Sequence, residues 1–415
     1  MNVVGGLVEG RSSLASVPRV VGGRYGLGSK EFTPGMAKAV FDNLKDWEAK
    51  NHFTIGINDD VTHTSLAYDE TFDIEPPEVR RCVFVGLGAD GTVGANKNSI
   101  KIIGDETSHY AQGYFVYDSK KSGSMTVSHL RFGPQPIRAP YLISKAGFVA
   151  CSQWHFVGKV PVLSYAGKGA TVLLNSPQRA EHVWAALPRE WQAELIRKEI
   201  KLFVVDATTV ANETGMGRRT NTVLQTCFFA LSGVLPRDEA ILAIKRTIEK
   251  TYGRKGKAIV AMNFAAVDAS LAGLHEVEIP AEISADAVAS VPPRFDHAPE
   301  FVQRVTALIL AGEGDRLPVS AMPVDGAWPT GTSQFEKRNI ALEIPEWDSS
   351  ICIQCNKCAM VCPHAAIRPK FYDPRSLDGA PEAFPSVPFR SAEFKGRSYT
   401  LHGVFALCAG VSGQR

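Results

Sequence analysis

The sequence has no long hydrophobic run and almost no net charge, and each of these absences excludes a class of function. No stretch of its 415 residues approaches the ~18 consecutive apolar residues that a membrane-spanning helix needs. The formal net charge is +2, so no excess of basic residues indicates binding to nucleic acid or to a membrane surface. Residues 1–20 also lack the continuous apolar core of a signal peptide. We therefore expect a cytoplasmic protein, with an organelle matrix as the remaining option.

Cysteine is present, but it is not spread along the chain as in a disulfide-stabilised protein. Four of the 8 cysteines fall between residues 352 and 362. Cys82, Cys151 and Cys227 lie alone in apolar surroundings, and Cys408 stands near the end. A secreted disulfide scaffold distributes its cysteines through a short chain, so this pattern indicates a reducing compartment. We expect the three isolated thiols to be structural and to pack as small hydrophobic side chains.

Short apolar runs alternate with helical patterns between residues 78 and 275. The first run, Cys82–Val85, is typical of a buried parallel strand. The alternation predicts a Rossmann-like α/β domain with a mostly parallel sheet. The further strands expected are Tyr114–Tyr117, Tyr141–Ile143, Ala170–Leu174 and Leu202–Val205, and the helices expected are Gln178–Ala186, Trp191–Lys201, Thr220–Leu231 and Asp238–Tyr252.

The rest of the chain divides around this domain, since 415 residues suffice for about two to four domains. Residues 1–77 precede it and contain an expected helix from Pro34 to about Lys50, with Thr33 as N-cap. Residues 276–345 are rich in proline and predict a small α+β connector with a helix at Glu300–Ala311. Residues 346–401 form a partial ferredoxin-like module, and residues 402–415 are a divergent tail.

The strongest motif is the cysteine run Cys352-Ile-Gln-Cys355-Asn-Lys-Cys358-Ala-Met-Val-Cys362-Pro363. Its spacing is the C-x2-C-x2-C-x3-C-P run of bacterial ferredoxins. Zinc is the alternative ligand, but zinc sites commonly pair one C-x2-C with a second half much farther along the chain. The motif therefore predicts an iron–sulfur site with Cys352, Cys355, Cys358 and Cys362 as metal ligands.

The same motif raises a question about the fourth ligand. In two-cluster ferredoxins the fourth cysteine of each run binds the other cluster. Downstream of the run this sequence offers only Cys408. We therefore predict at most one 4Fe-4S cluster, held by Cys352, Cys355 and Cys358, with Cys362, Cys408 or solvent in the fourth position.

A second motif follows the Cys82–Val85 run. Gly86-Leu-Gly88-Ala-Asp-Gly91-Thr-Val-Gly94 fits the G-x-G-x-x-G pattern between an expected strand and an expected helix. Glycines at this place let the backbone approach a phosphate group, and a helix N-terminus favours negative charge. The expected cofactor-binding residues are Gly86, Gly88, Gly91, Gly94, Asn96 and Lys97. The alternative is a glycine-packed turn without a ligand.

A third cluster, Asp59 and Asp60 with His63, follows the strand-like segment Phe53–Ile57. Two carboxylates and an imidazole resemble a metal site. An Asx-type turn at the end of a strand explains the same residues better.

Together these motifs resemble the pyruvate:ferredoxin (flavodoxin) oxidoreductase family. The segments Gly22–Pro34 and His52–Leu66 resemble the end of that family's second domain. Gly86–Gly104 resembles the glycine loop of its third, gamma-type domain. Gly331–Arg338 resembles its connector, known by the triplet Glu-Lys-Arg, and the cysteine run follows in the family's order. The resemblance extends from residue 19 to about residue 400.

The resemblance implies an enzyme that converts pyruvate and coenzyme A into acetyl-CoA and carbon dioxide on thiamine diphosphate. Electrons would leave through 4Fe-4S clusters to ferredoxin or flavodoxin, and the enzyme would be a homodimer. The thiamine-binding domains of the family have no counterpart here, and we find no thiamine-diphosphate motif of the Gly-Asp-Gly…Asn type. We therefore expect an internal portion of the enzyme that is inactive alone and needs separate thiamine-binding domains or chains.

Two other functions remain open at this point. The chain could be a non-catalytic electron-transfer or scaffold subunit that works with separately encoded thiamine-binding chains. It could also be a nicotinamide- or flavin-linked dehydrogenase built on Gly86–Gly94. We assign no catalytic residue for either of these two functions. The sequence does not name the 2-oxoacid.

Overall fold

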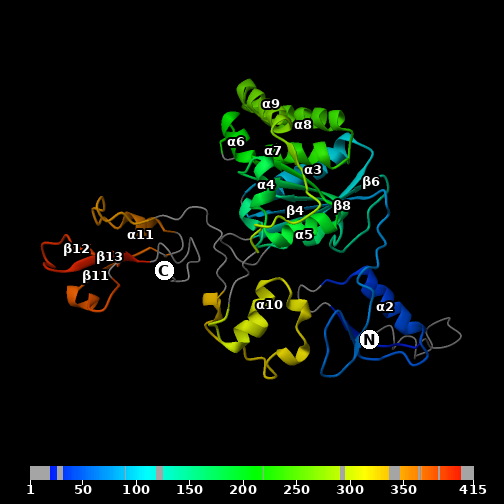
Figure 1. Ribbon diagram of the computed structural model, residues 1–415, viewed down its shortest axis with the longest axis horizontal. Helices are drawn as coiled ribbons and strands as arrows, with labels where there is room; N and C mark the ends of the chain where they lie inside the picture. Colours follow the sequence, from blue (N-terminus) through cyan, green and yellow to red (C-terminus); the bar gives the residue numbers. More distant parts are fainter. Residues whose placement is uncertain are drawn as a thin grey trace. The chain divides into compact units, whose positions relative to one another are not determined.

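The computed structural model describes residues 19–402 apart from 26–30, 89, 118–124, 218, 290–294, 336–345, 363–364, 366 and 382–383. In this part of the chain, no helix combines the length and the apolar character that crossing a membrane requires. The chain divides into two compact units, residues 1–296 with 307–328 and residues 297–306 with 329–415 (Figure 1). The finer five-part division drawn from the sequence stays a prediction.

The first unit begins with a small parallel sheet and one helix. Strands β1 (Gly23–Tyr25), β2 (Phe53–Ile55) and β3 (Ser65–Leu66) pair in that order. Helix α2 (Pro34–Lys45) has proline in its first turn, and the Thr33 hydroxyl accepts a hydrogen bond from the Met36 amide at 3.3 Å. The predicted N-cap is thus confirmed, whereas the helix ends earlier than expected, at Lys45.

A seven-stranded sheet forms the centre of the first unit, in the order β10-β9-β8-β7-β4-β6-β5. The four central strands β9, β8, β7 and β4 pair in parallel. The outer strands β10, β6 and β5 join through antiparallel pairs, and β10 and β5 are the edges. The predicted mostly parallel sheet is confirmed at its centre. The strand bounds are β4 (Arg80–Leu87), β5 (Tyr110–Tyr117), β6 (Met125–Gly133), β7 (Ala146–Cys151), β8 (Ala166–Asn175), β9 (Lys201–Val205) and β10 (His275–Val277).

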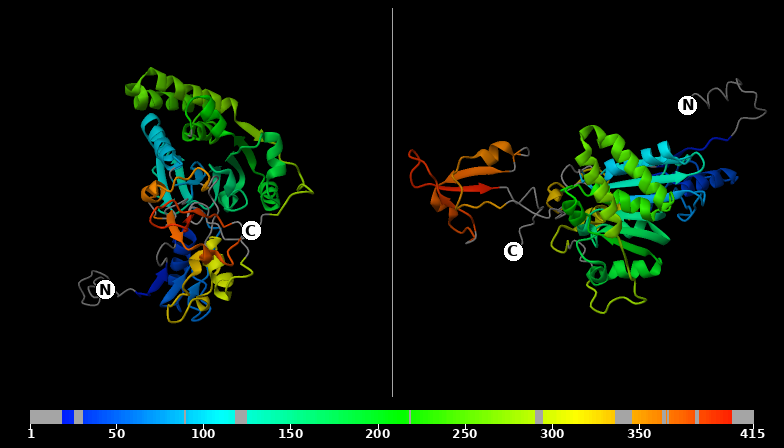
Figure 2. Two further views of the ribbon diagram at one scale, coloured as in Figure 1. Left: turned by 90° about the vertical axis from the view of Figure 1, so that its left-hand side faces the viewer. Right: turned by 90° about the horizontal axis from the view of Figure 1, so that it is seen from above.

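Helices cover both faces of this sheet, as in an α/β domain (Figures 1 and 2). One face packs against α3 (Thr92–Glu106), α6 (Ala207–Glu213), α7 (Asn221–Leu231), α8 (Arg237–Tyr252) and α9 (Lys257–Ala272). The other face packs against α4 (Ala180–Ala186) and α5 (Arg189–Arg197). Short 3-10 turns occupy Trp154–Phe156, Val162–Tyr165 and Gly253–Lys255.

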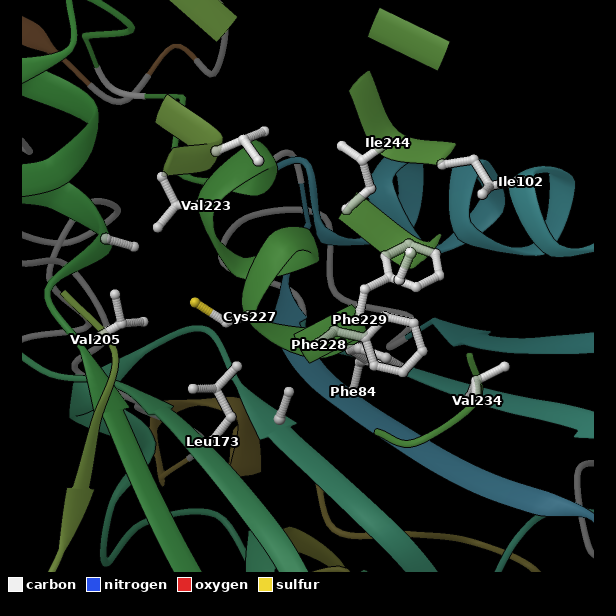
Figure 3. Close-up of a cluster of buried hydrophobic side chains, with 14 of the residues drawn as sticks. Phe84, Ile102, Leu173, Val205, Val223, Cys227, Phe228, Phe229, Val234 and Ile244 are labelled. Carbon is white, nitrogen blue, oxygen red and sulfur yellow. The ribbon is translucent and has the colours of Figure 1, made fainter. Parts of the chain in front are cut away.

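Alternating side chains of the central strands build the two cores. In β4, Cys82 and Phe84 join the core under α7, whereas Val83 and Val85 join the core on the opposite face. Figure 3 shows the first of these cores, where Phe84 and Phe228 meet edge to face with ring centroids 5.0 Å apart. Because both faces are buried, the strands read as continuous apolar runs, which is why β4, β8 and β9 could be predicted from the sequence.

The strand β6 and the helix α9 escaped prediction, and one predicted strand was wrong. Tyr141–Ile143 is not a strand, and the parallel strand begins later, as β7. In β6 the apolar pattern is interrupted by Ser128, His129 and Arg131, yet all three are buried. Arg131 forms an ion pair with Glu75 at 2.6 Å, with exposed side-chain fractions of 1% and 5%. A buried ion pair of this kind looks polar in the sequence and therefore hides a core strand.

The connector packs onto the small N-terminal sheet. The Val319 amide donates to the Asn58 carbonyl oxygen at 2.9 Å, and Asn58 forms a parallel bridge with Pro318. The 3-10 turns Gly314–Arg316 and Val319–Ala321 flank this contact. The helix expected at Glu300–Ala311 is a π-helical turn, Val302–Thr306, continued by α10 (Ala307–Leu310).

The second unit contains a three-stranded antiparallel sheet in the order β11-β13-β12. Its strands are β11 (Arg368–Tyr372), β12 (Val387–Pro388) and β13 (Ser398–His402), and its turns are Thr332–Phe335 and Pro374–Leu377. The short helix α11 (Lys357–Val361) lies within the cysteine run. Tyr399, on the central strand, is 2% exposed and stacks on Phe389 with ring centroids 5.9 Å apart. This small aromatic core supports the cysteine run.

Candidate functional site

The glycine loop, residues 86–94, joins the carboxyl end of β4 to the N-terminus of α3. The neighbouring parallel strand β7 ends beside it, followed by Ser152 and Gln153. The edge formed by the carboxyl ends of parallel strands is where open α/β sheets bind their ligands. The structure therefore puts the loop in the predicted strand–turn–helix setting.

The carboxylate of Asp90 fills this loop. It accepts hydrogen bonds from the backbone amides of Leu87 and Thr92, both at 2.8 Å. It also accepts from the Ser152 hydroxyl at 2.7 Å and from the Gln153 side-chain amide at 3.2 Å. A phosphate-binding loop offers its free amides to the ligand. Here two of those amides already bind the carboxylate of Asp90. No motif in the sequence indicates this role for Asp90.

The four glycines of the loop play different parts. A side chain at Gly86 would meet Thr92 at 2.7 Å and Asp90 at 3.0 Å, so this glycine serves internal packing. Gly91 is left-handed, with φ of 89°, and is the N-cap of α3. Gly88 lies in the turn directly after β4. Gly94 has no atom near its missing side chain and lines a cavity of about 260 Å³ beside α7 and α8. Unlike Gly86 and Gly91, Gly94 therefore has open space around it.

The two side chains predicted to assist the loop lie elsewhere. Asn96 is 3% exposed, and its Nδ2 atom has no hydrogen-bond partner among the described residues. It lines a separate cavity of about 20 Å³, which has room for one water molecule. The Lys97 ammonium lies 5.4 Å from the centre of the Phe115 ring on β5. Lys97 therefore engages an aromatic ring of the edge strand in this structure.

The cysteine loop, residues 352–362, presents its thiols on the second unit. Cys355 and Cys358 are exposed, and Cys352 and Cys362 are half-buried. Cys358 lies in α11, and Cys362 follows the end of that helix. The amide of Gln354 donates to the Cys352 sulfur at 3.4 Å. None of the four cysteines forms a disulfide.

Two residues beside Cys355 adopt the left-handed backbone conformation. Gln354 has φ of 60° and Asn356 has φ of 58°, and neither is glycine. Each such residue costs on the order of 1 kcal/mol. Gln354 compensates by bonding the Pro388 carbonyl and the Arg390 amide, both at 2.8 Å. Asn356 accepts a hydrogen bond from the Tyr399 hydroxyl at 2.7 Å. Neither side chain could be picked out from the ligand spacing alone.

The donor set fits an iron–sulfur cluster better than a single metal ion. Among the described residues, no three His, Cys, Asp or Glu side chains gather closely enough to hold one ion. Ligands of a single zinc ion would all lie about 2.3 Å from one point. The thiolates of a 4Fe-4S cluster are farther apart because each binds a different iron. Cys352, Cys355 and Cys358 all act electrostatically on the Tyr399 hydroxyl, and with its burial they raise the pKa of Tyr399. The three thiols therefore all lie near the Tyr399 hydroxyl.

The other expected thiols are structural, as predicted. Cys82, Cys151 and Cys227 are each 1% exposed or less. Burial raises the pKa of Cys82 and raises the pKa of Cys151 and of Cys227 to about 12. Their burial among apolar side chains, in the unit that does not hold the cysteine loop, fits a packing role. Cys408, the alternative fourth ligand, lies outside the described residues.

The Asp59 and Asp60 cluster is an Asx-type turn, as the sequence favoured. Asp59 accepts from the backbone amides of Thr62 at 2.9 Å and Thr64 at 3.0 Å, and these bonds help to lower its pKa. Asp60 accepts from the Ser320 amide at 3.0 Å. Asp59 therefore fixes the loop itself, and Asp60 ties this loop to Ser320.

Comparison with known proteins decides the ancestry. Residues 81–273 match the family described as pyruvate ferredoxin/flavodoxin oxidoreductase. Residues 289–341 match a domain of unknown function, and residues 344–367 match a 4Fe-4S binding domain. The pyruvate-flavodoxin oxidoreductase of Nostoc sp. is 56% identical over 407 residues, which are 97% of this chain and 34% of that protein. This chain belongs to the pyruvate ferredoxin/flavodoxin oxidoreductase family.

A second curated relative agrees with this assignment. The pyruvate-flavodoxin oxidoreductase of Rhodospirillum rubrum is 58% identical over 386 residues, covering 92% of this chain and 32% of that protein. A solved pyruvate oxidoreductase subunit from Thermotoga maritima covers 48% of this chain and 99% of its own, with 15% identity and a TM-score of 0.39. The present chain spans about a third of the length of the curated relatives that it matches. It contains a 4Fe-4S binding domain of the family.

Proposed function

We propose that this chain is the part of a pyruvate:ferredoxin (flavodoxin) oxidoreductase that carries electrons out of the enzyme. The observation that supports this most directly is the cysteine loop, which holds four thiols at the ferredoxin spacing, exposed or half-buried and without disulfides. A bound 4Fe-4S cluster would supply a one-electron carrier at this loop. Cys352, Cys355 and Cys358 would bind it as thiolates, with Cys362 or Cys408 as the fourth thiol. The half-buried setting of Cys352 and Cys362 would limit the access of water.

The complete reaction needs groups beyond those in this chain. We propose that pyruvate is oxidised on thiamine diphosphate held by other domains or chains, and that ferredoxin or flavodoxin takes up the electrons. We also propose a homodimer and a cytoplasmic or other reducing compartment. The reducing compartment is supported by the unbridged thiols of the cysteine loop.

Coenzyme A is the second ligand that we propose, and it concerns the gamma-type domain. The observation that favours it is the open backbone at Gly94, beside a cavity of about 260 Å³. Since Asp90 occupies two amides of the glycine loop, a phosphate of coenzyme A would reach the Gly94 side of α3 or would displace that carboxylate. The glycine loop as a coenzyme A site remains a proposal.

The cluster site can be tested by reconstituting the full chain with iron and sulfide under anaerobic conditions. We expect the broad charge-transfer absorption of a 4Fe-4S cluster and an electron paramagnetic resonance signal after reduction with dithionite. Cys355→Ser should lose most of this absorption because it removes a thiolate ligand. Cys82→Ala is the matched control, since its thiol is buried in the other unit and should leave the absorption unchanged. Equal spectra for wild type and Cys355→Ser would contradict the assignment.

A further inference from the structure

Residues between the cysteines, which are not metal ligands themselves, are held in place by hydrogen bonds. Gln354 and Asn356 flank Cys355, and both have left-handed backbones. A non-glycine residue stays in this conformation only where its surroundings hold it there. The side chains of both residues supply that support, since each forms hydrogen bonds with residues of the small sheet.

The side-chain amide of Gln354 forms two hydrogen bonds with backbone groups at the end of β12. Its Nε2 donates to the Pro388 carbonyl and its Oε1 accepts from the Arg390 amide, both at 2.8 Å. Its own backbone amide donates to the Cys352 sulfur at 3.4 Å. Amide bonds to cysteine sulfur are among the features that set the reduction potential of an iron–sulfur cluster. The two side-chain bonds of the same residue help to orient this amide.

The Asn356 side chain is held by Tyr399, while its carbonyl oxygen accepts a hydrogen bond from the Met360 amide of α11 at 3.1 Å. The Tyr399 hydroxyl donates to Asn356 Oδ1 at 2.7 Å, and the residue is 2% exposed. Its ring lies parallel to Phe389 within 9° and meets Trp347 edge to face, with centroids 6.0 Å apart. It pairs with Phe371 on β11 and with Val387 on β12.

We propose that Tyr399, acting through Asn356, is a positioning residue that sets the reduction potential of the cluster. The inference rests on the proposed cluster at Cys352, Cys355 and Cys358. The hydroxyl fixes the left-handed conformation of Asn356, directly after Cys355. This conformation keeps the Gln354 amide on the Cys352 sulfur. Hydrogen bonds to the sulfur stabilise the reduced, more negative state. Loosening the turn therefore lowers the reduction potential.

The test is a potentiometric titration of the reconstituted full chain, followed by electron paramagnetic resonance. Tyr399→Phe keeps the stacked ring and removes only the hydroxyl. We expect it to bind the same amount of iron but to shift the oxidised-to-reduced ratio about fivefold toward oxidised, which is about 40 mV for a one-electron couple. Asn356→Gly removes the acceptor and keeps a residue that favours the left-handed conformation. It should give the same shift, and the double variant should add nothing further.

Tyr372→Phe is the matched control. Tyr372 lies on β11, the strand next to that of Tyr399. Its hydroxyl donates a hydrogen bond to the Ser386 hydroxyl at 2.8 Å. A wild-type potential in this variant would support the proposal, whereas an equal shift would show a general effect of losing a hydroxyl and overturn it. An unchanged or raised potential in Tyr399→Phe would overturn the inference and leave the cluster assignment intact. A wild-type chain that takes up no iron would overturn both.

Discussion

The glycine loop and the cysteine loop are both tight turns built on short sequence motifs, and they treat their polar groups in opposite ways. In the glycine loop, amides of Leu87 and Thr92 are bound by the carboxylate of Asp90. In the cysteine loop, the polar side chains bond the supporting sheet, and the thiols stay free of disulfides. A motif that satisfies its own donors stabilises the fold, while one that keeps its ligand atoms available can bind a cofactor.

The difference between the thiols of the two units should give the largest effect. At pH 8 and without a cluster, Cys355 and Cys358 should react with a thiol reagent at least about 100-fold faster than Cys151 and Cys227. Burial raises the pKa of Cys151 and of Cys227 to about 12, so only a very small fraction of either thiol is the reactive thiolate at pH 8. Mass spectrometry of labelled peptides measures each rate. Rapid labelling of Cys82, Cys151 and Cys227 in the folded chain would show that the comparison is wrong.

The chain alone should show no pyruvate-dependent reduction of ferredoxin, even with its cluster in place. The reason is that the sequence holds no thiamine-diphosphate motif of the Gly-Asp-Gly…Asn type. The measurement is an anaerobic assay with pyruvate, coenzyme A, thiamine diphosphate and ferredoxin. Dithionite serves as the control, because it should reduce the cluster directly. Turnover without added subunits would contradict the account.

Asp90→Ala should destabilise the glycine loop. The carboxylate accepts four hydrogen bonds within 3.2 Å, and its loss removes the acceptor that the Leu87 and Thr92 amides share. We expect a fall in the free energy of unfolding of about 3 kcal/mol. Asp206→Ala is the matched comparison, since Asp206 caps α6 at the end of β9 and accepts from Thr209 alone. It should cost only about 1 kcal/mol.

Urea denaturation measures both changes. Equal losses for the two aspartates would mean that Asp90 is an ordinary helix cap. A stable Asp90→Ala chain that binds phosphate more tightly would instead make the loop an anion site that the carboxylate blocks.

The smallest effect should come from Gly94→Ala. Nothing lies near the missing side chain, so alanine should fit and raise the free energy of unfolding by up to about 1 kcal/mol. If coenzyme A meets the backbone here, the added methyl group should also weaken its binding several-fold. Gly104→Ala is the control, because Gly104 lies in the same helix with equally open space. It should stabilise α3 without changing the affinity found by calorimetry.

Gly88→Val tests the turn itself. It should weaken coenzyme A binding, because a branched side chain would close the approach of the ligand to the backbone. An unchanged affinity in both Gly88→Val and Gly94→Ala would remove coenzyme A from this loop.

Much of the fold follows from local patterns in the sequence. Continuous apolar runs revealed β4, β8 and β9 because these strands are buried on both faces. The strand β6 was missed because its core contains the Arg131–Glu75 ion pair, whose partners are 56 residues apart. No local pattern encodes such a pair.

The candidate site likewise has parts that local sequence patterns predict and parts that only tertiary packing brings together. Ligand spacing identified the cysteine run, since four thiols within eleven residues have a specific chemical use. Spacing could not show that Asp90 would occupy the glycine loop, because any carboxylate near a helix start could also point outward. Nor could it pair Tyr399 with Asn356 across 43 residues. These partners come from tertiary packing.

The central claim is that the cysteine loop holds one cluster, and counting iron and sulfide tests it most directly. The full chain is reconstituted anaerobically, separated from unbound iron and analysed for both elements. The account predicts about four iron and about four sulfide atoms per chain, lost in Cys355→Ser and kept in Cys82→Ala. About eight iron atoms per chain, or none, would contradict it.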